Sequence, residues 1–63
     1  MGGGAGAATS LNNLGSLLES MGQYEEARPF YECALTIYEQ TLGANHPTTN
    51  IVCNNLRTLE SKM

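Results

Sequence analysis

The fold of this chain is decided by residues 11–35, which read LNNLGSLLESMGQYEEARPFYECAL. Met21-Gly22-Gln23 predicts a turn inside this stretch, because glycine readily adopts the left-handed conformation that ends many helices. The apolar residues before the turn recur at steps of three and four, which is the spacing of one face of an α-helix. They are Leu11, Leu14, Leu17, Leu18 and Met21. The stretch therefore predicts two helices joined by a tight turn.

Outward from this stretch, the sequence predicts three helices over about residues 7–21, 24–42 and 47–61. Residues 1–8, MGGGAGAA, are predicted to be a flexible Gly/Ala leader, because glycine loses much backbone entropy on ordering. Residues 9–46 then form one helix-turn-helix unit with its connector. Residues 47–63 form a third helix. Pro47 suits its first position, where a missing N–H costs nothing, and its expected cap is one of Asn45, His46 and Thr48.

The second predicted helix is apolar on two sides, which is typical of a helix packed between neighbours. Pro29 in its interior predicts a kink or a lost backbone hydrogen bond near Glu25. Gly15 in the first helix costs about 1 kcal/mol relative to alanine, so it predicts a close approach of the second helix. One apolar row holds Tyr24, Ala27, Tyr31, Ala34, Leu35, Tyr38 and Leu42, and the other holds Phe30, Cys33 and Ile37.

Part of the chain is repeated after 42 residues. When residues 9–21 are aligned with residues 51–63, five of the thirteen positions are identical. The third helix is therefore a second copy of the first, and a fixed period of this length indicates a helical repeat. The identical residues of the first copy are Asn12, Asn13, Leu14, Leu17 and Met21.

Small and apolar residues stand at Leu11, Leu14, Gly15, Leu18, Gly22, Tyr24, Ala27, Tyr31 and Ala34. In these positions the chain resembles the tetratricopeptide repeat, and its 42-residue period resembles that of the kinesin light chain subclass. The resemblance implies an all-α fold, with an antiparallel helix pair and a C-terminal capping helix, or one and a half repeats of an α-solenoid. Arg57 and Glu60 stand where the pattern wants a small and an apolar residue, which is why residues 47–63 are interpreted as a cap.

The resemblance implies a non-catalytic protein–protein interaction module whose concave groove holds a peptide or a partner chain. An alternative is that the asparagines at 12–13 and 54–55 bond to one another and only hold the repeats in register. Asparagine suits either role, because its amide both donates and accepts hydrogen bonds. The groove residues carried over by position are Asn12, Ser16, Glu19, Ser20, Asn54, Thr58 and Lys62.

Other classes of function find little support in the sequence. There is no aspartate, only one histidine, and no CxxC pair, so neither a catalytic site, a cofactor nor a metal is expected. The net charge is −3, and three scattered cations make no basic patch for nucleic acid or an anionic membrane. No apolar run approaches the roughly 20 residues of a membrane span. We expect a cytoplasmic, intracellular protein with reduced thiols.

Cys33 and Cys53 are interpreted as inert core thiols, since a buried cysteine behaves as a small hydrophobic residue. A disulfide within or between chains is the main alternative, and a nucleophilic Cys33 with His46 as its base is a remote one. His46 belongs to the connector and is expected to act in helix capping or turn packing.

Self-association is the second functional hypothesis. One side of the first two helices has no neighbour in the predicted arrangement, and large exposed apolar patches usually meet a partner. The prediction is a homodimer, formed either by stacking of the open sides or by a swap of the third helix across residues 43–47.

Overall fold

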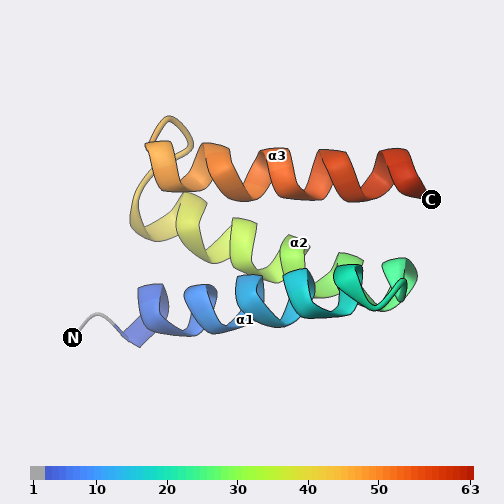
Figure 1. Cartoon of the computed structure of the whole chain (residues 1–63). Helices are drawn as coiled ribbons and strands as arrows, with labels where there is room; N and C mark the ends of the chain where they lie inside the picture. The colour runs from blue at the N-terminus through green and yellow to red at the C-terminus, as the bar shows by residue number, and fades with distance from the viewer. Residues whose placement is uncertain (1–2) are drawn as a thin grey trace.

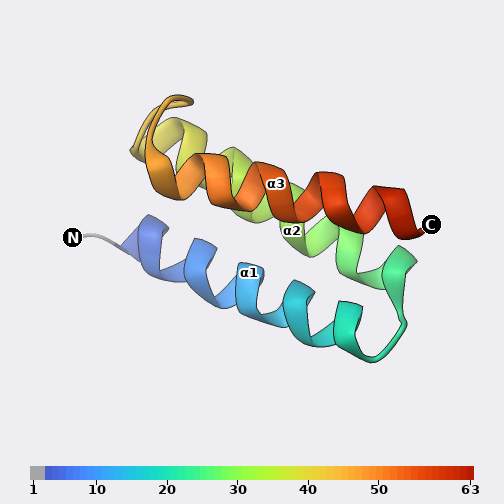
Figure 2. The ribbon, with the colours of Figure 1, turned by 45° about the horizontal axis from the view of Figure 1, so that its top comes forward.

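The computed structural model describes the backbone of residues 3–63 and the side chains of residues 6–63. It contains three helices, α1 (Gly3–Ser20), α2 (Tyr24–Thr41) and α3 (Pro47–Lys62). In Figure 1, α2 runs antiparallel to both other helices and lies between them. The turned view of Figure 2 places α1 and α3 in one layer with α2 behind them. The all-α prediction, a helical hairpin followed by a capping helix, is confirmed.

The helix boundaries agree with the predicted ones except at the start of α1. This helix begins at Gly3, so the predicted leader of residues 1–8 does not extend to Ala8. Alanine is the best helix former, and Ala8 is fully buried in a cluster with Ala34, Tyr38 and Val52. Residues 1–2 of the predicted leader lie outside the described part of the chain.

The turn between α1 and α2 is a Schellman motif. Gly22 has a φ of +81°, in the left-handed region that glycine adopts without strain. The N–H of Gln23 donates to the carbonyl of Leu18 at 2.9 Å, and the N–H of Gly22 donates to the carbonyl of Glu19 at 3.0 Å. These bonds satisfy carbonyls that the end of a helix leaves unpaired, so the predicted turn is confirmed.

The connector between α2 and α3 ends in a histidine cap. Gly43, with a φ of +97°, follows the end of α2 as predicted. The Nδ1 atom of His46 accepts a hydrogen bond from the backbone N–H of Thr48 at 3.1 Å, and Pro47 occupies the first turn of α3. The expected capping role of His46 is therefore confirmed, and the structure selects it from the three candidate caps.

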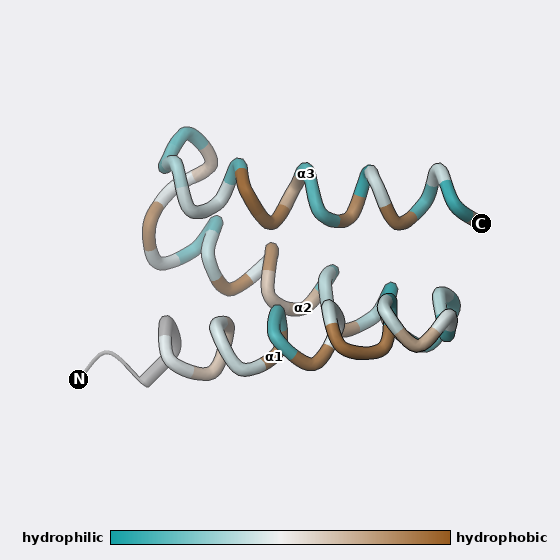
Figure 3. The backbone as a smooth tube through the Cα atoms, in the orientation of Figure 1, coloured by the Kyte–Doolittle hydropathy of each residue, from teal (hydrophilic) through white to brown (hydrophobic). Residues whose placement is uncertain are grey.

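The core lies along one side of α2. Two clusters of buried residues follow one another there, and both join α2 to α3. A Cβ atom built on Gly15 of α1 would lie 3.0 Å from the Tyr31 ring, so α1 approaches α2 closely at this point, as predicted. In Figure 3, hydrophobic residues recur along α3, whereas the hydrophobic residues of α1 lie mainly in its later turns. The second cluster consists of Ala27, Tyr31 and Leu59, with Leu18, Tyr24 and Leu56 packed against it.

The other apolar row of α2 is only partly covered. Phe30 and Ile37 are half-buried, and Cys33 is exposed. The interpretation of Cys33 as a core thiol is therefore wrong, because α1 covers this row only partly and Cys33 lines an open hollow between α1 and α2. Both cysteines are free thiols. The helix itself continues through the exposed Pro29.

Alanine substitutions at two glycines of α1 should have opposite effects on stability. Gly6→Ala meets no atom within 4 Å, so it should raise the free energy of unfolding by up to about 1 kcal/mol through helix propensity. Gly15→Ala gains the same propensity but presses on the buried Tyr31 ring, and overpacking costs about 1–3 kcal/mol. We expect a net loss of stability for Gly15→Ala, measured by urea unfolding. Equal stabilisation by both substitutions would contradict the close packing of α1 on Tyr31.

Candidate functional site

The predicted groove residues lie on α1 and α3, the two helices that share one layer (Figure 2). Apart from Ser20, whose hydroxyl donates to the backbone carbonyl of Leu17 at 2.8 Å, those on each helix are spaced by three or four residues, so they form one stripe along each helix. Polar contacts between α1 and α3 hold the two stripes side by side. We call this surface the polar face, and it consists of Asn12, Ser16 and Glu19 of α1 with Asn54, Thr58 and Lys62 of α3.

One end of the polar face contains an amide pair. The Nδ2 atom of Asn55 donates a hydrogen bond to Oδ1 of Asn12 at 3.3 Å. This contact is the one that the alternative interpretation of the asparagines predicted, because it joins equivalent turns of the two repeat copies. Asn54 lies beside this pair with an exposed side chain. Asn12 therefore has a structural contact, while Asn54 is open to a ligand.

The other end of the polar face contains a three-residue network centred on Glu19. Lys62 of α3 contacts Glu19 with 2.8 Å between Nζ and Oε2. The hydroxyl of Tyr31 of α2 donates to Oε1 of Glu19, also at 2.8 Å. The Glu19 side chain is 15 % exposed, compared with 46 % for Lys62. Glu19 thus joins all three helices.

The role of Tyr31 in this network was missed by sequence reasoning, which placed Tyr31 only in the apolar row of α2. Its ring is buried, and its hydroxyl reaches the polar face. The available signal was the tyrosine itself, since a buried phenol needs a hydrogen-bond partner where phenylalanine needs none.

Each member of the network has a shifted pKa. The hydrogen bond from Lys62 lowers the pKa of Glu19, and this effect exceeds the opposing effect of burial. The same contact raises the pKa of Lys62. Burial raises the pKa of Tyr31, and the hydrogen bond to Glu19 adds to it. Near neutral pH the network therefore contains a carboxylate, an ammonium group and a neutral phenol.

The remaining predicted residues offer polar groups to solvent. Ser16 and Thr58 are exposed, as is Asn54. Their hydroxyl and amide groups donate and accept hydrogen bonds. Among residues 6–63, no group of three or more acidic, histidine or cysteine side chains is placed to hold a metal ion. The chemistry that this surface supports is hydrogen bonding.

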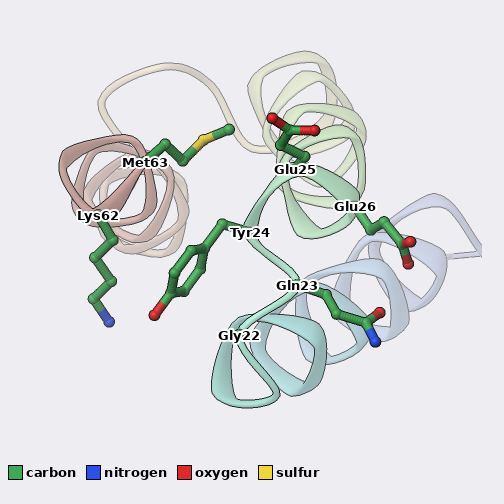
Figure 4. Close-up of a pocket in the computed structure, with 7 residues that line it drawn as sticks. All are labelled: Gly22, Gln23, Tyr24, Glu25, Glu26, Lys62 and Met63. Carbon is green, nitrogen blue, oxygen red and sulfur yellow. The ribbon is translucent and has the colours of Figure 1, made fainter.

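An open hollow of about 400 Å³ adjoins the Glu19 end of the polar face. Figure 4 shows the Tyr24 and Lys62 side chains extending along the same side of it, so Lys62 belongs to both surfaces. The hollow is lined by Gly22, Gln23, Tyr24, Glu25, Glu26, Lys62 and Met63.

None of the helices in the described part of the chain is long and apolar enough to cross a membrane.

Comparison with known proteins gives one match. The family model described as "Tetratricopeptide repeat" matches residues 7–48, which is two thirds of the chain. The matched residues include most of α1, all of α2 and the connector. No curated protein and no solved structure matches the chain.

Neutralising Glu19 should change how stability depends on pH. The pKa of Glu19 is lower in the folded state, so its contribution is fully present above the unfolded-state pKa of about 4.3. This contribution is lost as the pH falls through the folded-state value. Glu19→Gln should therefore lower the unfolding temperature at pH 7 and weaken its fall between about pH 5 and pH 2. Thermal unfolding followed by circular dichroism measures both effects.

The matched control for this experiment is Glu39→Gln. Glu39 is an exposed carboxylate of α2 that takes part in none of the ion pairs among residues 6–63. This variant should keep the pH dependence of the wild-type chain. The proposed contribution of Glu19 is contradicted if the two variants show the same dependence.

Proposed function

Because the chain belongs to the tetratricopeptide repeat family, whose repeats are non-catalytic scaffolds for protein–protein interaction, we propose that it binds a partner polypeptide through the polar face. The observation that carries this proposal is the set of exposed amide and hydroxyl groups at Ser16, Asn54 and Thr58, held at one layer of the bundle by contacts at both ends.

The spacing of these groups suits a short segment of main chain. Asn54, Thr58 and Lys62 follow one another at about one turn of α3, so they span roughly 11–12 Å. An extended peptide covers this distance in about four residues. Every such residue other than proline offers one backbone donor and one acceptor. An asparagine amide can bond to both kinds of group. Binding of this kind recognises the main chain of the peptide more than its side chains.

The charges around the polar face favour an uncharged polar segment over an acidic one. The ammonium group of Lys62 is paired with Glu19 at 2.8 Å. Arg28 lies against Glu32 at 3.0 Å and Glu60 at 3.6 Å. Of the cations in the described chain, only Arg57 has no such pair among these salt bridges. A carboxylate ligand would have to compete with Glu19 for Lys62.

We also propose that the chain belongs to the kinesin-light-chain-like subclass and acts inside the cell. The subclass is supported by the recurrence of Asn-Asn-Leu at residues 12–14 and 54–56, a period of 42 residues. The intracellular location is supported by the two free thiols, since secreted proteins usually pair their cysteines.

Peptide binding at the polar face can be tested by NMR titration with a library of short uncharged peptides. We expect amide shifts at Ser16, Asn54 and Thr58. Asn54→Ala should weaken binding about fivefold, because one hydrogen bond contributes roughly 1 kcal/mol. Gln40→Ala, on the exposed surface of α2, should bind like the wild-type chain. Shifts confined to α2, or no shifts with any peptide, would overturn the proposal.

Self-association is a second candidate function, favoured by a separate observation. Leu14 and Leu17 of α1 and Met21 of the turn that follows are 46 %, 56 % and 57 % exposed. Clustered apolar side chains of this size are typical of interaction surfaces. We propose a homodimer in which these side chains are covered, and an exchange of α3 between chains is the other route to it.

The oligomeric state can be measured directly by sedimentation equilibrium. A dimer of the 6.8-kDa chain should form as the concentration rises into the high micromolar range. In a swapped dimer, shortening the connector by deleting Ala44 and Asn45 should stabilise the dimer. In a stacked dimer, the deletion should leave the association unchanged. A monomer at millimolar concentration would rule out both.

A further inference from the structure

We infer that the side of the bundle opposite α3 is a two-fold interface, on which α1 of a second copy of this chain packs antiparallel to α1. This inference rests on the self-association proposed above and names the surface that performs it. We call this surface the open edge, and it consists of Leu11, Leu14 and Leu17 of α1, Met21 of the turn that follows, and Phe30 and Cys33 of α2.

The direction of the α1 side chains defines the open edge. Asn12 and Glu19 both contact α3, through Asn55 and Lys62. Leu14 follows Asn12 by two residues. Met21, whose N–H still donates to the Leu17 carbonyl at 3.1 Å just after the end of α1, follows Glu19 by two. At 3.6 residues per turn, two residues correspond to about 200° around the helix. Leu14 and Met21 therefore point away from α3, where no other described helix lies.

The internal repeat indicates that this row of side chains is suited to a helix–helix contact. At the 42-residue spacing, Leu14 and Leu17 of α1 correspond to Leu56 and Leu59 of α3. Leu59 is fully buried against α2, and Leu56 packs against the same cluster. Leu17, which carries the same side chain as Leu59, is 56 % exposed. The same pair of leucines is therefore covered by α2 in the copy on α3 and exposed in the copy on α1.

A hollow in the open edge offers a place for an apolar side chain. Its volume is about 200 Å³, and it opens between α1 and α2. Leu11, Pro29, Phe30 and Cys33 line it, so only apolar groups and one thiol meet the occupant. Filling such a space with a leucine or methionine side chain removes apolar surface from water on both molecules.

The distribution of charge favours a second copy as the occupant. Glu19 is the only charged residue of α1, and it faces α3, where it is paired with Lys62. The α1 side of the open edge thus carries no charge that would select an oppositely charged partner. Two copies with a net charge of −3 each repel least where they meet through an uncharged surface.

A two-fold axis at Leu14 gives a complementary register. In an antiparallel pair centred there, Leu17 of each copy lies against Leu11 of the other, beside the apolar hollow. Met21 then lies against Ala7, which is small and exposed. A stable dimer buries about 800 Å² of each partner. That is about a fifth of the 3875 Å² surface, comparable to one long side of a molecule measuring 33 × 20 × 13 Å.

The test compares Leu17→Lys with Ile51→Lys by sedimentation equilibrium. The two residues are 56 % and 57 % exposed, but Ile51 lies on α3, away from the open edge. Leu17→Lys should raise the dimer dissociation constant by at least about 100-fold, because each dimer loses two buried leucines and gains two buried charges. Ile51→Lys should leave it unchanged. Circular dichroism should give both variants the wild-type helix content.

A second measurement keeps the leucine side chains of the open edge unchanged. In a Cys53→Ser variant, the rate at which Cys33 reacts with a thiol reagent should fall several-fold as the protein concentration passes through the dimerisation range. In a Cys33→Ser variant, the rate at Cys53 should stay constant. Association of the wild-type chain without protection of Cys33, or with equal effects of the two lysine substitutions, would overturn the open edge and leave self-association standing. A monomeric wild-type chain would overturn both.

Discussion

The structure depends on the close approach of α1 and α2 at Gly15 and Tyr31. The absence of a side chain on Gly15 lets the Tyr31 ring lie against the backbone of α1, where an added Cβ would be only 3.0 Å from ring carbons. This position brings the Tyr31 hydroxyl to Glu19, and Glu19 in turn pairs with Lys62. One packing contact in the core therefore orients an ion pair on the surface and aligns α1 with α3.

The helical hairpin consequently has two different sides. On the side of α3, Leu56 and Leu59 complete the core. The Asn12–Asn55 and Glu19–Lys62 contacts join α1 to α3 on the same side. On the opposite side, Leu14 and Leu17 repeat the same pattern without a helix to cover them. A chain of this size buries only about 60 % of the surface that its unfolded form exposes, so its stability by itself is marginal. The proposed contact with another polypeptide at either side would add to its stability.

Sequence reasoning was accurate wherever one residue type decides a local structure. Gly22 and Gly43 mark the ends of helices because each adopts a positive φ, and the alternatives for the α3 cap already included His46. It placed the start of α1 too late, because the glycines before Ala8 weigh against a helix locally. Burial of Ala8 against Tyr38 and Val52 is a tertiary effect. The burial of Cys33 was predicted wrongly for the same reason, since an apolar row does not tell which neighbour covers it.

The sequence by itself determined the three helices, their turns and the repeat pattern, because helical periodicity and capping act between residues a few positions apart. Six polar positions on α1 and α3 were also assigned to one face, as the resemblance to the tetratricopeptide repeat implied. Only the tertiary structure decided how these residues pair. Asn12 contacts Asn55, and Glu19 contacts Lys62, each across 43 positions in the chain. Contacts between such distant residues depend on how α1 and α3 pack on α2, and that packing depends on side-chain volume at positions such as Gly15, Tyr31 and Leu59.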